Sequence, residues 1–284
     1  MNEISFGNLN LKVLIFLICC LSLACQTEGK VLKVLAIGNS FSEDSVEQNL
    51  YEITAELGDT LIIGNAYIGG CSIDRHVNNL KNGLPEYSYR KIENGILKRT
   101  ENQTLRDIIK DEDWDIISLQ QVSGLSGRTS SYSNLPMLKQ LVDENALNKD
   151  LEIVWHNTWA YTNDYRTELY EYYGSNQDNM LDSIINVAQT IIPANNIKRI
   201  IPSGIAIQNA RKEFGDILNR DGYHLAIPLG RFVAASAWAG FLTGKDVRTA
   251  DFKPDGITDE DARKAREAAF NAVNCDFIFM NHFK

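Results

Sequence analysis

Short apolar segments alternate with amphipathic ones along most of this chain. Five segments have the aliphatic and aromatic content typical of strands: 31–37, 61–63, 114–119, 151–155 and 197–201. Segments with helical periodicity lie between them, among them 43–57, 105–109 and 180–192. Apolar strands that alternate with amphipathic helices form parallel sheets covered on both faces. The sequence therefore predicts an α/β fold, a three-layer α/β/α sandwich around a mostly parallel, five-stranded, flavodoxin-like sheet.

A hairpin and a last helix complete this pattern. Asn94-Gly95 lies between two β-prone runs, 87–92 and 96–100. This dipeptide is a strong hairpin signal, because both of its residues tolerate the positive φ that a tight hairpin turn requires. We therefore expect an inserted β-hairpin beside the sheet. Residues 259–273 predict the last amphipathic helix.

The first 25 residues predict an export signal. An apolar run, 13–24, follows Lys12 and is too short to span a bilayer as a folded helix. Ser22-Leu23-Ala24-Cys25 resembles a bacterial lipoprotein cleavage site, in which the cysteine becomes the lipidated first residue. Plain secretory cleavage after Ala24 is the alternative. Both place a single domain, 26–284, outside the cytoplasm, as a periplasmic or outer-membrane-associated lipoprotein or as a secreted soluble protein.

Charge and cysteine content narrow the function classes. Removing residues 1–25 deletes Lys12 and Glu3, so the formal charge stays at −9. This acidic balance argues against nucleic acid as a partner, and against a membrane except through a lipid on Cys25. Cys71 and Cys275 are the two cysteines outside the signal; they could form a bridge or remain two thiols. Metal-ligand spacing is absent, so we expect no metal and no cofactor.

Two motifs far apart in the chain carry the residue types that nucleophilic acyl transfer requires. Ser40 lies on the predicted turn between the first strand and its helix, and Asp221 precedes His224 by three residues. An imidazole with a pKa near ~6.5 can accept the proton of a seryl hydroxyl, while a carboxylate holds the ring and favours the imidazolium. Ser40 with Glu43 also fits a capping box, so a helix-capping role is the alternative for this serine.

The two motifs resemble blocks of the SGNH/GDSL hydrolases. Gly38-Asn39-Ser40-Phe41-Ser42 is similar to their Gly-Asp-Ser-Leu-Ser block, and Asp221-x-x-His224 to their last block. The resemblance implies that Ser40 is the nucleophile, His224 the general base and then acid, and Asp221 the residue that orients the histidine. It also implies an oxyanion hole that contains the backbone amides of Ser40 and Gly70. Through Gln120-Gln121 and the segments 156–161 and 221–225, the chain also resembles a bacterial branch of this superfamily that is of unknown function.

Two positions depart from the superfamily pattern. Asn39 replaces the aspartate beside the nucleophile, and the asparagine that normally donates to the oxyanion is missing after the third strand. Gln120 and Gln121 end that strand instead. We expect one of them to donate to the oxyanion; the alternative is that both only cap the strand end.

Aromatic residues suggest the substrate. Residues 155–173 are rich in tyrosine and tryptophan, whose faces bind sugar rings and other flat apolar surfaces. Trp159, Tyr161 and His156 are candidate substrate contacts, although His156 could be purely structural. We expect a serine esterase that hydrolyses short acyl esters, specifically O-acetyl esters of carbohydrates. Its partner is then a small-molecule or glycan ester. The alternatives are a non-catalytic glycan-binding lipoprotein with a degenerate site, or an anion cradle at 38–40. The oligomeric state stays open.

Overall fold

The computed structural model describes residues 30–275. The predicted export signal and Cys25 lie outside these residues. Every element below lies within residues 31–273. No helix within the described residues is long and apolar enough to cross a membrane.

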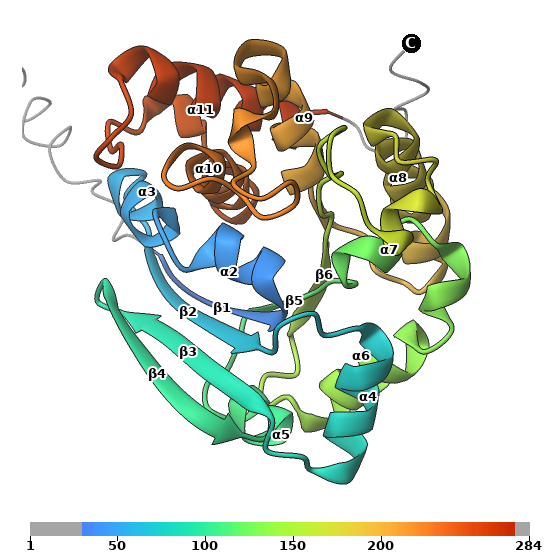
Figure 1. Ribbon diagram of the computed structural model, residues 1–284. Coiled ribbons are helices and arrows are strands. Elements are labelled where there is room, and N and C mark those ends of the chain that lie inside the picture. The colour runs from blue at the N-terminus through green and yellow to red at the C-terminus, as the bar shows by residue number, and fades with distance from the viewer. Residues whose placement is uncertain (1–29, 276–284) are drawn as a thin grey trace, which may run out of the picture. The chain divides into compact units, whose positions relative to one another are not determined.

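A seven-stranded sheet runs through the unit in the order β4-β3-β2-β1-β5-β6-β7 (Figure 1). Its strands are β1 (Val31–Gly38), β2 (Thr60–Tyr67), β3 (Tyr87–Glu93), β4 (Ile96–Gln103), β5 (Ile116–Leu119), β6 (Glu152–His156) and β7 (Ile200–Ile201). Neighbours from β2 through β1 to β7 are parallel, whereas β3 and β4 pair antiparallel. The predicted α/β fold with a mostly parallel sheet is confirmed, but the sheet has seven strands and not five.

The two additional strands come from the predicted hairpin. Asn94 and Gly95 form its turn with φ angles of 52° and 73°. The hairpin does not lie beside the sheet, because β3 pairs with β2 from Ile63↔Ile92 to Tyr67↔Ser88. An edge strand presents unpaired N–H and C=O groups, and β3 satisfies those of β2. The local sequence signals the turn but not the edge to which the hairpin is added.

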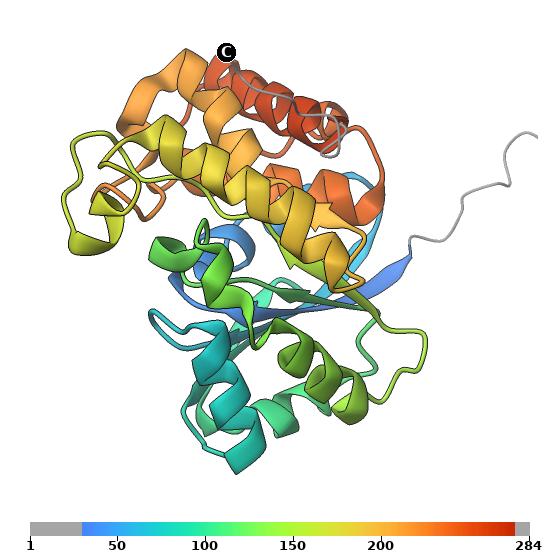
Figure 2. The same ribbon diagram turned by 90° about the vertical axis from the view of Figure 1, so that its right-hand side faces the viewer.

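Helices cover both faces of the sheet (Figures 1 and 2). One face carries α4 (Ile73–Asn82), α5 (Leu105–Ile109) and α6 (Leu135–Asn145). The other carries α2 (Ser40–Val46), α3 (Leu50–Glu56), α9 (Ser203–Phe214), α10 (Leu229–Thr243) and α11 (Asp259–Val273). α8 (Gln177–Ala194) contributes to both cores, and α7 (Glu168–Glu171) lies in the connection before it. Alternate residues of β1 enter opposite cores, which gives the predicted three layers.

One predicted helix is interrupted. The segment 43–57 forms two helices, because Asn49 between α2 and α3 adopts a φ of 68°. Asparagine visits this left-handed region more readily than most residues. The helical spacing of apolar residues persists across the break, since Val46, Leu50 and Ile53 are all buried. The last helix, 259–273, is confirmed at both ends.

The strand order reverses beside β1, whose two neighbours are β2 and β5. In doubly wound sheets a ligand crevice opens at this point, beyond the carboxyl ends of the strands. The connections that leave β1, β2 and β5 carry Ser40, Gly70 and the segment 120–124. The fold therefore brings together three of the polar segments that the sequence singles out.

Candidate active site

A pocket of about 430 Å³ lies at this strand reversal. Ser40 and His224 both line it, although they are far apart in the sequence. Gly69, Gly70, Ser123 and Gly124 contribute from the connections after β2 and β5. A second hollow, of about 470 Å³, lies between α9 and α11 and is lined by none of the residues of the two sequence motifs. The first pocket therefore contains residues of both motifs.

The Ser40 hydroxyl is not used to cap the helix that it begins. Asn39 is the cap instead, because its Oδ1 accepts a hydrogen bond from the Phe41 amide at 3.0 Å. No hydrogen bond within residues 30–275 engages Ser40 Oγ. The capping alternative for Ser40 is thus not what the structure shows, and Ser40 is among the residues that line the pocket.

Asp221 and His224 form a hydrogen-bonded pair. His224 Nδ1 lies 2.7 Å from Asp221 Oδ2, and Asp221 Oδ1 accepts the backbone amide of His224 at 2.8 Å. Since a carboxylate only accepts, Nδ1 carries the proton and Nε2 is left as the basic nitrogen. Burial by itself would raise the pKa of Asp221, but the hydrogen bonds from His224 and Tyr223 outweigh it and lower this pKa below 3.8. Asp221 therefore stays ionised beside the ring.

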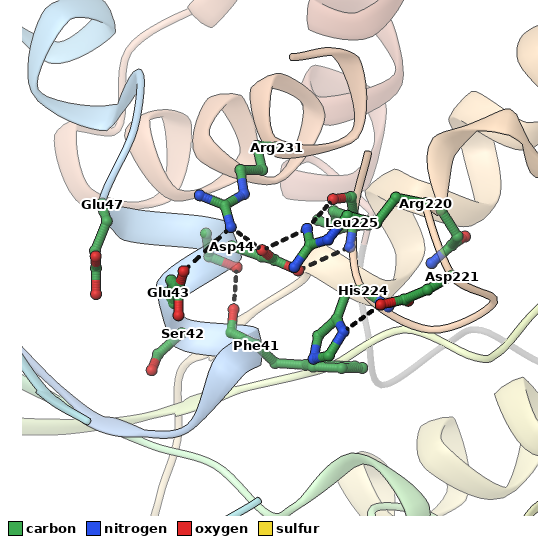
Figure 3. Close-up of polar contacts among 12 residues, drawn as sticks. Phe41, Ser42, Glu43, Asp44, Glu47, Arg220, Asp221, His224, Leu225 and Arg231 are labelled. Atoms are coloured by element: carbon green, nitrogen blue, oxygen red, sulfur yellow. Dashed lines mark hydrogen bonds and ion pairs between the residues drawn. The ribbon is translucent and has the colours of Figure 1, made fainter. Parts of the chain in front are cut away.

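Aromatic packing connects the nucleophile turn to the histidine. Phe41, the residue after Ser40, stacks on Trp159 with ring centroids 4.1 Å apart. Its ring also meets the His224 ring edge-on at 6.2 Å, and the two side chains lie next to each other in Figure 3. Trp159 Nε1 donates to the Tyr223 carbonyl at 2.7 Å. The imidazole is therefore held from the side of α2 as well as by Asp221.

A glycine permits the sharp turn between Asp221 and His224. Gly222 has a φ of 89°, and a Cβ there would lie 2.5 Å from the Tyr165 ring. Other residues would be strained in this conformation and would also displace the tyrosine. The close approach of Tyr165 places a second aromatic wall beside the pair.

Asn39 joins three connections of the site. Its Oδ1 also accepts from Gln120 Nε2 at 2.8 Å, and its Nδ2 donates to the Cys71 carbonyl at 3.1 Å. An aspartate could not make the bond to Cys71, because a carboxylate has no proton to donate. The departure from the superfamily pattern at this position is therefore part of a hydrogen-bond network specific to an amide.

We expect Asn39→Asp to destabilise the fold. The new carboxylate would be buried, since Asn39 is 1% exposed, and it would face the Cys71 carbonyl without a donor. An unpaired buried group of this kind costs about 1–3 kcal/mol, and more when it is charged. Thermal unfolding at pH 7 should show a lower midpoint than wild type, and the deficit should shrink at acidic pH as the carboxylate is protonated. A pH-independent midpoint equal to that of wild type would contradict this account.

Both glutamine amides are engaged in hydrogen bonds to other residues. Gln121 Nε2 donates to the carbonyl and the hydroxyl of Ser131, at 2.9 and 3.2 Å. Its Oε1 accepts the backbone amides of Ile73 and Val122. Gln120 Nε2 donates to Asn39, and neither glutamine lines the pocket. This geometry favours the alternative that both hold the strand end in place, and does not match the expected oxyanion role.

His156 supports the site from within the core. It is fully buried, its Nδ1 donates to Gln120 Oε1 at 2.7 Å, and its Nε2 lies 3.0 Å from Ser203 Oγ. Burial lowers the pKa of His156 to about 3, so the ring is neutral. A chain of hydrogen bonds thus runs from Ser203 through His156 and Gln120 to Asn39. The structure places His156 in this support and not in contact with the pocket.

The aromatic lining is only partly the one expected from the sequence. Trp159 is fully buried under Phe41, whereas Tyr161 lines the pocket with its hydroxyl 2.8 Å from Ser123 Oγ. The lining also includes residues that were not singled out from the sequence, among them Tyr67, Ser123, Tyr165 and Tyr223. Tyr67 ends β2, which extends four residues beyond the predicted strand 61–63. Tyr223 lies inside the Asp-Gly-Tyr-His motif, where only the spacing was considered.

The remaining cysteines do not form a bridge. Cys71 is buried, Cys275 is exposed, and both are free thiols. Burial raises the pKa of the Cys71 thiol to about 12, so it stays protonated. Within residues 30–275, no group of three or more histidine, cysteine, aspartate or glutamate side chains is arranged to hold a metal ion.

Fold and pocket define a class: a doubly wound α/β protein with a serine and a histidine–aspartate pair at the carboxyl ends of its parallel strands. The chain belongs to the family described as a domain of unknown function (DUF4886), whose model matches residues 33–272. The crystal structure of a DUF4886 family protein from Bacteroides uniformis ATCC 8492 is similar over 86% of this chain and 95% of that chain. The two sequences are 44% identical, and the TM-score is 0.84.

Other solved structures are more distant. TesA is 11% identical over 76% of this chain and 99% of its own, with a TM-score of 0.46. A gut microbial diltiazem-metabolizing enzyme is 10% identical over 76% of this chain and 47% of its own, with a TM-score of 0.44. Comparison with curated proteins gave no match. Likeness at these TM-scores does not define an activity, so the argument for function rests on the pocket.

Proposed function

We propose that the protein is a serine ester hydrolase that acts through an acyl-enzyme on Ser40. One observation carries the proposal: Ser40, whose hydroxyl has no hydrogen-bond partner in the described chain, lines the same pocket as His224, which is held by a carboxylate. Nucleophile, base and orienting acid are the groups that acyl transfer needs. Capping, the competing role for Ser40, is taken by Asn39.

The steps follow from these groups. His224 Nε2 accepts the Ser40 proton as Oγ attacks the ester carbonyl, and the imidazolium then gives that proton to the leaving alcohol. Water attacks the acyl-enzyme with His224 again as base, which releases the acid and restores the serine. The Asp221 carboxylate keeps Nδ1 protonated and stabilises the positive ring in both steps.

Three donors are proposed for the oxyanion. Two are the backbone amides of Ser40 and Gly70; both residues line the pocket, and Gly70 adopts a left-handed φ of 62°. Ser123 adds a side-chain hydroxyl from the connection after β5, where the superfamily pattern has an asparagine and where the glutamines are engaged elsewhere. Each such donor lowers the barrier by roughly 3 kcal/mol in other enzymes.

The lining favours a neutral substrate. Within the described chain, the residues that line the pocket include no lysine, arginine, aspartate or glutamate. Tyr67, Tyr161, Tyr165 and Tyr223 supply flat faces with hydroxyl groups at their edges, which suits sugar rings. We therefore propose that the substrates are short acyl esters, specifically O-acetyl esters of carbohydrates. The predicted export signal supports action outside the cytoplasm, with Cys25 as the proposed lipid anchor.

Covalent labelling tests this proposal. A fluorophosphonate probe should modify Ser40, because it reacts with a serine hydroxyl that a neighbouring base activates. Peptide mapping by mass spectrometry identifies the modified residue, and heat-denatured protein serves as the control. Absence of labelling in the folded protein would instead favour the non-catalytic glycan-binding alternative, and modification of another serine would place the nucleophile elsewhere.

A further inference from the structure

The proposed chemistry does not account for one buried carboxylate beside the site. Asp44 lies on α2, four residues after Ser40, and is fully buried. It does not line the pocket. We propose that Asp44 is a positioning residue, which holds the Asp221–His224 pair against the helix that begins at the nucleophile. The inference rests on the proposed function, since it concerns the approach of His224 to Ser40.

The residues that contact Asp44 lie far from it in the sequence. Asp44 Oδ2 accepts the Leu225 backbone amide at 2.7 Å. Asp44 Oδ1 pairs with Arg220 Nη1 at 3.2 Å and with Arg231 Nη2 at 2.6 Å. Figure 3 shows the carboxylate between these three groups, on the side of α2 that faces the 220–225 segment. One side chain therefore binds two other elements at the same time.

The two contacts within the segment bracket the catalytic pair. Arg220 immediately precedes Asp221, and Leu225 immediately follows His224. The segment is also closed on itself, because the Arg220 amide donates to the His224 carbonyl at 2.9 Å and the Arg220 guanidinium contacts the Leu225 carbonyl. Asp221 and His224 therefore move with a closed loop, and Asp44 fixes that loop to α2. Ser40 lies one helical turn away on the same helix.

The charges around Asp44 explain why an acid occupies the position. A carboxylate offers about four acceptor sites, and here it meets three donors at once. Glu43 also faces this cluster, pairing with Arg231 at 3.3 Å and with Arg90 at 2.9 Å. An asparagine has a single acceptor oxygen, so its NH2 group would face either the two arginines or the Leu225 amide. The loop would then lose one of its two attachments to α2.

Glu47, the residue that caps the C-terminus of α2, provides a matched control. Its carboxylate is buried, and it accepts from Arg90 at 2.9 Å and from Asn65 at 2.7 Å. These partners belong to β3 and β2, and within residues 30–275 no hydrogen bond or ion pair joins Glu47 to the 220–225 segment. Glu47→Gln therefore removes a buried, arginine-paired charge without touching the attachment of the catalytic pair.

The experiment compares Asp44→Asn with Glu47→Gln in hydrolysis of p-nitrophenyl acetate. For Asp44→Asn we expect kcat to fall by about 100-fold with KM within about twofold of wild type, because displacement of a reacting group by about 1 Å has a cost of this size. Glu47→Gln should keep kcat within about threefold at a comparable loss of thermal stability. Fluorophosphonate labelling of Ser40 should slow in parallel with kcat.

A milder variant covers the case in which Asp44→Asn fails to fold. The Arg220 side chain is 36% exposed, so Arg220→Met should fold while it loses one of the two attachments. We expect kcat to fall by about 10-fold, and hydrogen exchange at the Leu225 amide to become faster than in wild type.

The outcomes separate the two proposals. If wild type hydrolyses the ester and Ser40→Ala does not, but the Asp44 and Arg220 variants keep full kcat, Asp44 has no positioning role. If Asp44→Asn and Glu47→Gln lose kcat equally, the effect is one of general stability and the inference is also overturned. If wild type shows neither turnover nor labelling of Ser40, the proposed function itself has failed.

Discussion

Replacing Ser40 by alanine is expected to lower kcat for p-nitrophenyl acetate by about 10⁴- to 10⁶-fold, the range found when the nucleophile of a serine hydrolase is removed. Alanine lacks the oxygen that forms the acyl-enzyme, and no described side chain substitutes for it in the hydrogen-bonded arrangement around His224. Stability should change little, because Ser40 Oγ makes no hydrogen bond in the described chain. Release of p-nitrophenol and thermal unfolding provide the two measurements.

Ser42→Ala is the matched control for this prediction. Ser42 belongs to the same pentapeptide, but it is buried, and its hydroxyl lies within hydrogen-bond distance of the Asn39 carbonyl, at 2.7 Å, and of Asn65 Oδ1, at 2.8 Å. Loss of the Ser42 hydroxyl should lower the free energy of unfolding by about 1 kcal/mol, and the variant should keep most of its kcat. Equal turnover by Ser40→Ala and wild type would refute the acyl-enzyme on Ser40.

Asp221→Asn is expected to lower kcat by about 10⁴-fold with little change in KM. The amide is neutral, so it no longer stabilises the imidazolium, and its Nδ2 can hold His224 in the wrong tautomer. Circular dichroism should show an intact fold, because the side chain of Asp221 is 42% exposed. Asp74→Asn, an exposed aspartate at the start of α4, is the control and should retain full activity. Similar kinetics for the two variants would remove Asp221 from the mechanism.

The lowered pKa of Asp221 also sets the direction of a pH effect on stability. A carboxylate whose pKa is lower in the folded than in the unfolded state contributes stability above its unfolded pKa, near ~3.9, and loses it as pH falls through the folded value. The pair should therefore support the native state at neutral pH and cease to do so under strongly acidic conditions. The partial exposure of Asp221 keeps this contribution small.

Local sequence patterns predict much of the fold. The parallel strands and the amphipathic helices follow from their periodicity, and the hairpin turn follows from Asn94-Gly95. The break at Asn49 was not predicted, because the apolar spacing continues across it. The pairing of β3 with β2 was not predicted either, since it depends on an edge that is distant in the sequence.

The candidate site divides in the same way. Ser40, Asp221 and His224 were found from residue types and spacing, and the tertiary structure places Ser40 and His224 at one pocket. Sequence spacing does not report where a side chain points. The roles predicted for four side chains depended on this: Gln120, Gln121, Trp159 and His156. Their hydrogen bonds and packing partners come from segments far away in the chain.

The sequence by itself determined the α/β alternation, the acid–histidine spacing and the candidate nucleophile, because each of these depends on neighbours within a few residues. Only the tertiary structure decided that the hairpin extends the sheet, that Asn39 and not Ser40 caps α2, and that Asp44 on that helix accepts a hydrogen bond from Leu225, the residue after His224. These features are contacts between residues far apart in the chain, as with Asp44 and Leu225. Burial and hydrogen-bond partners of that kind exist only once the chain has folded.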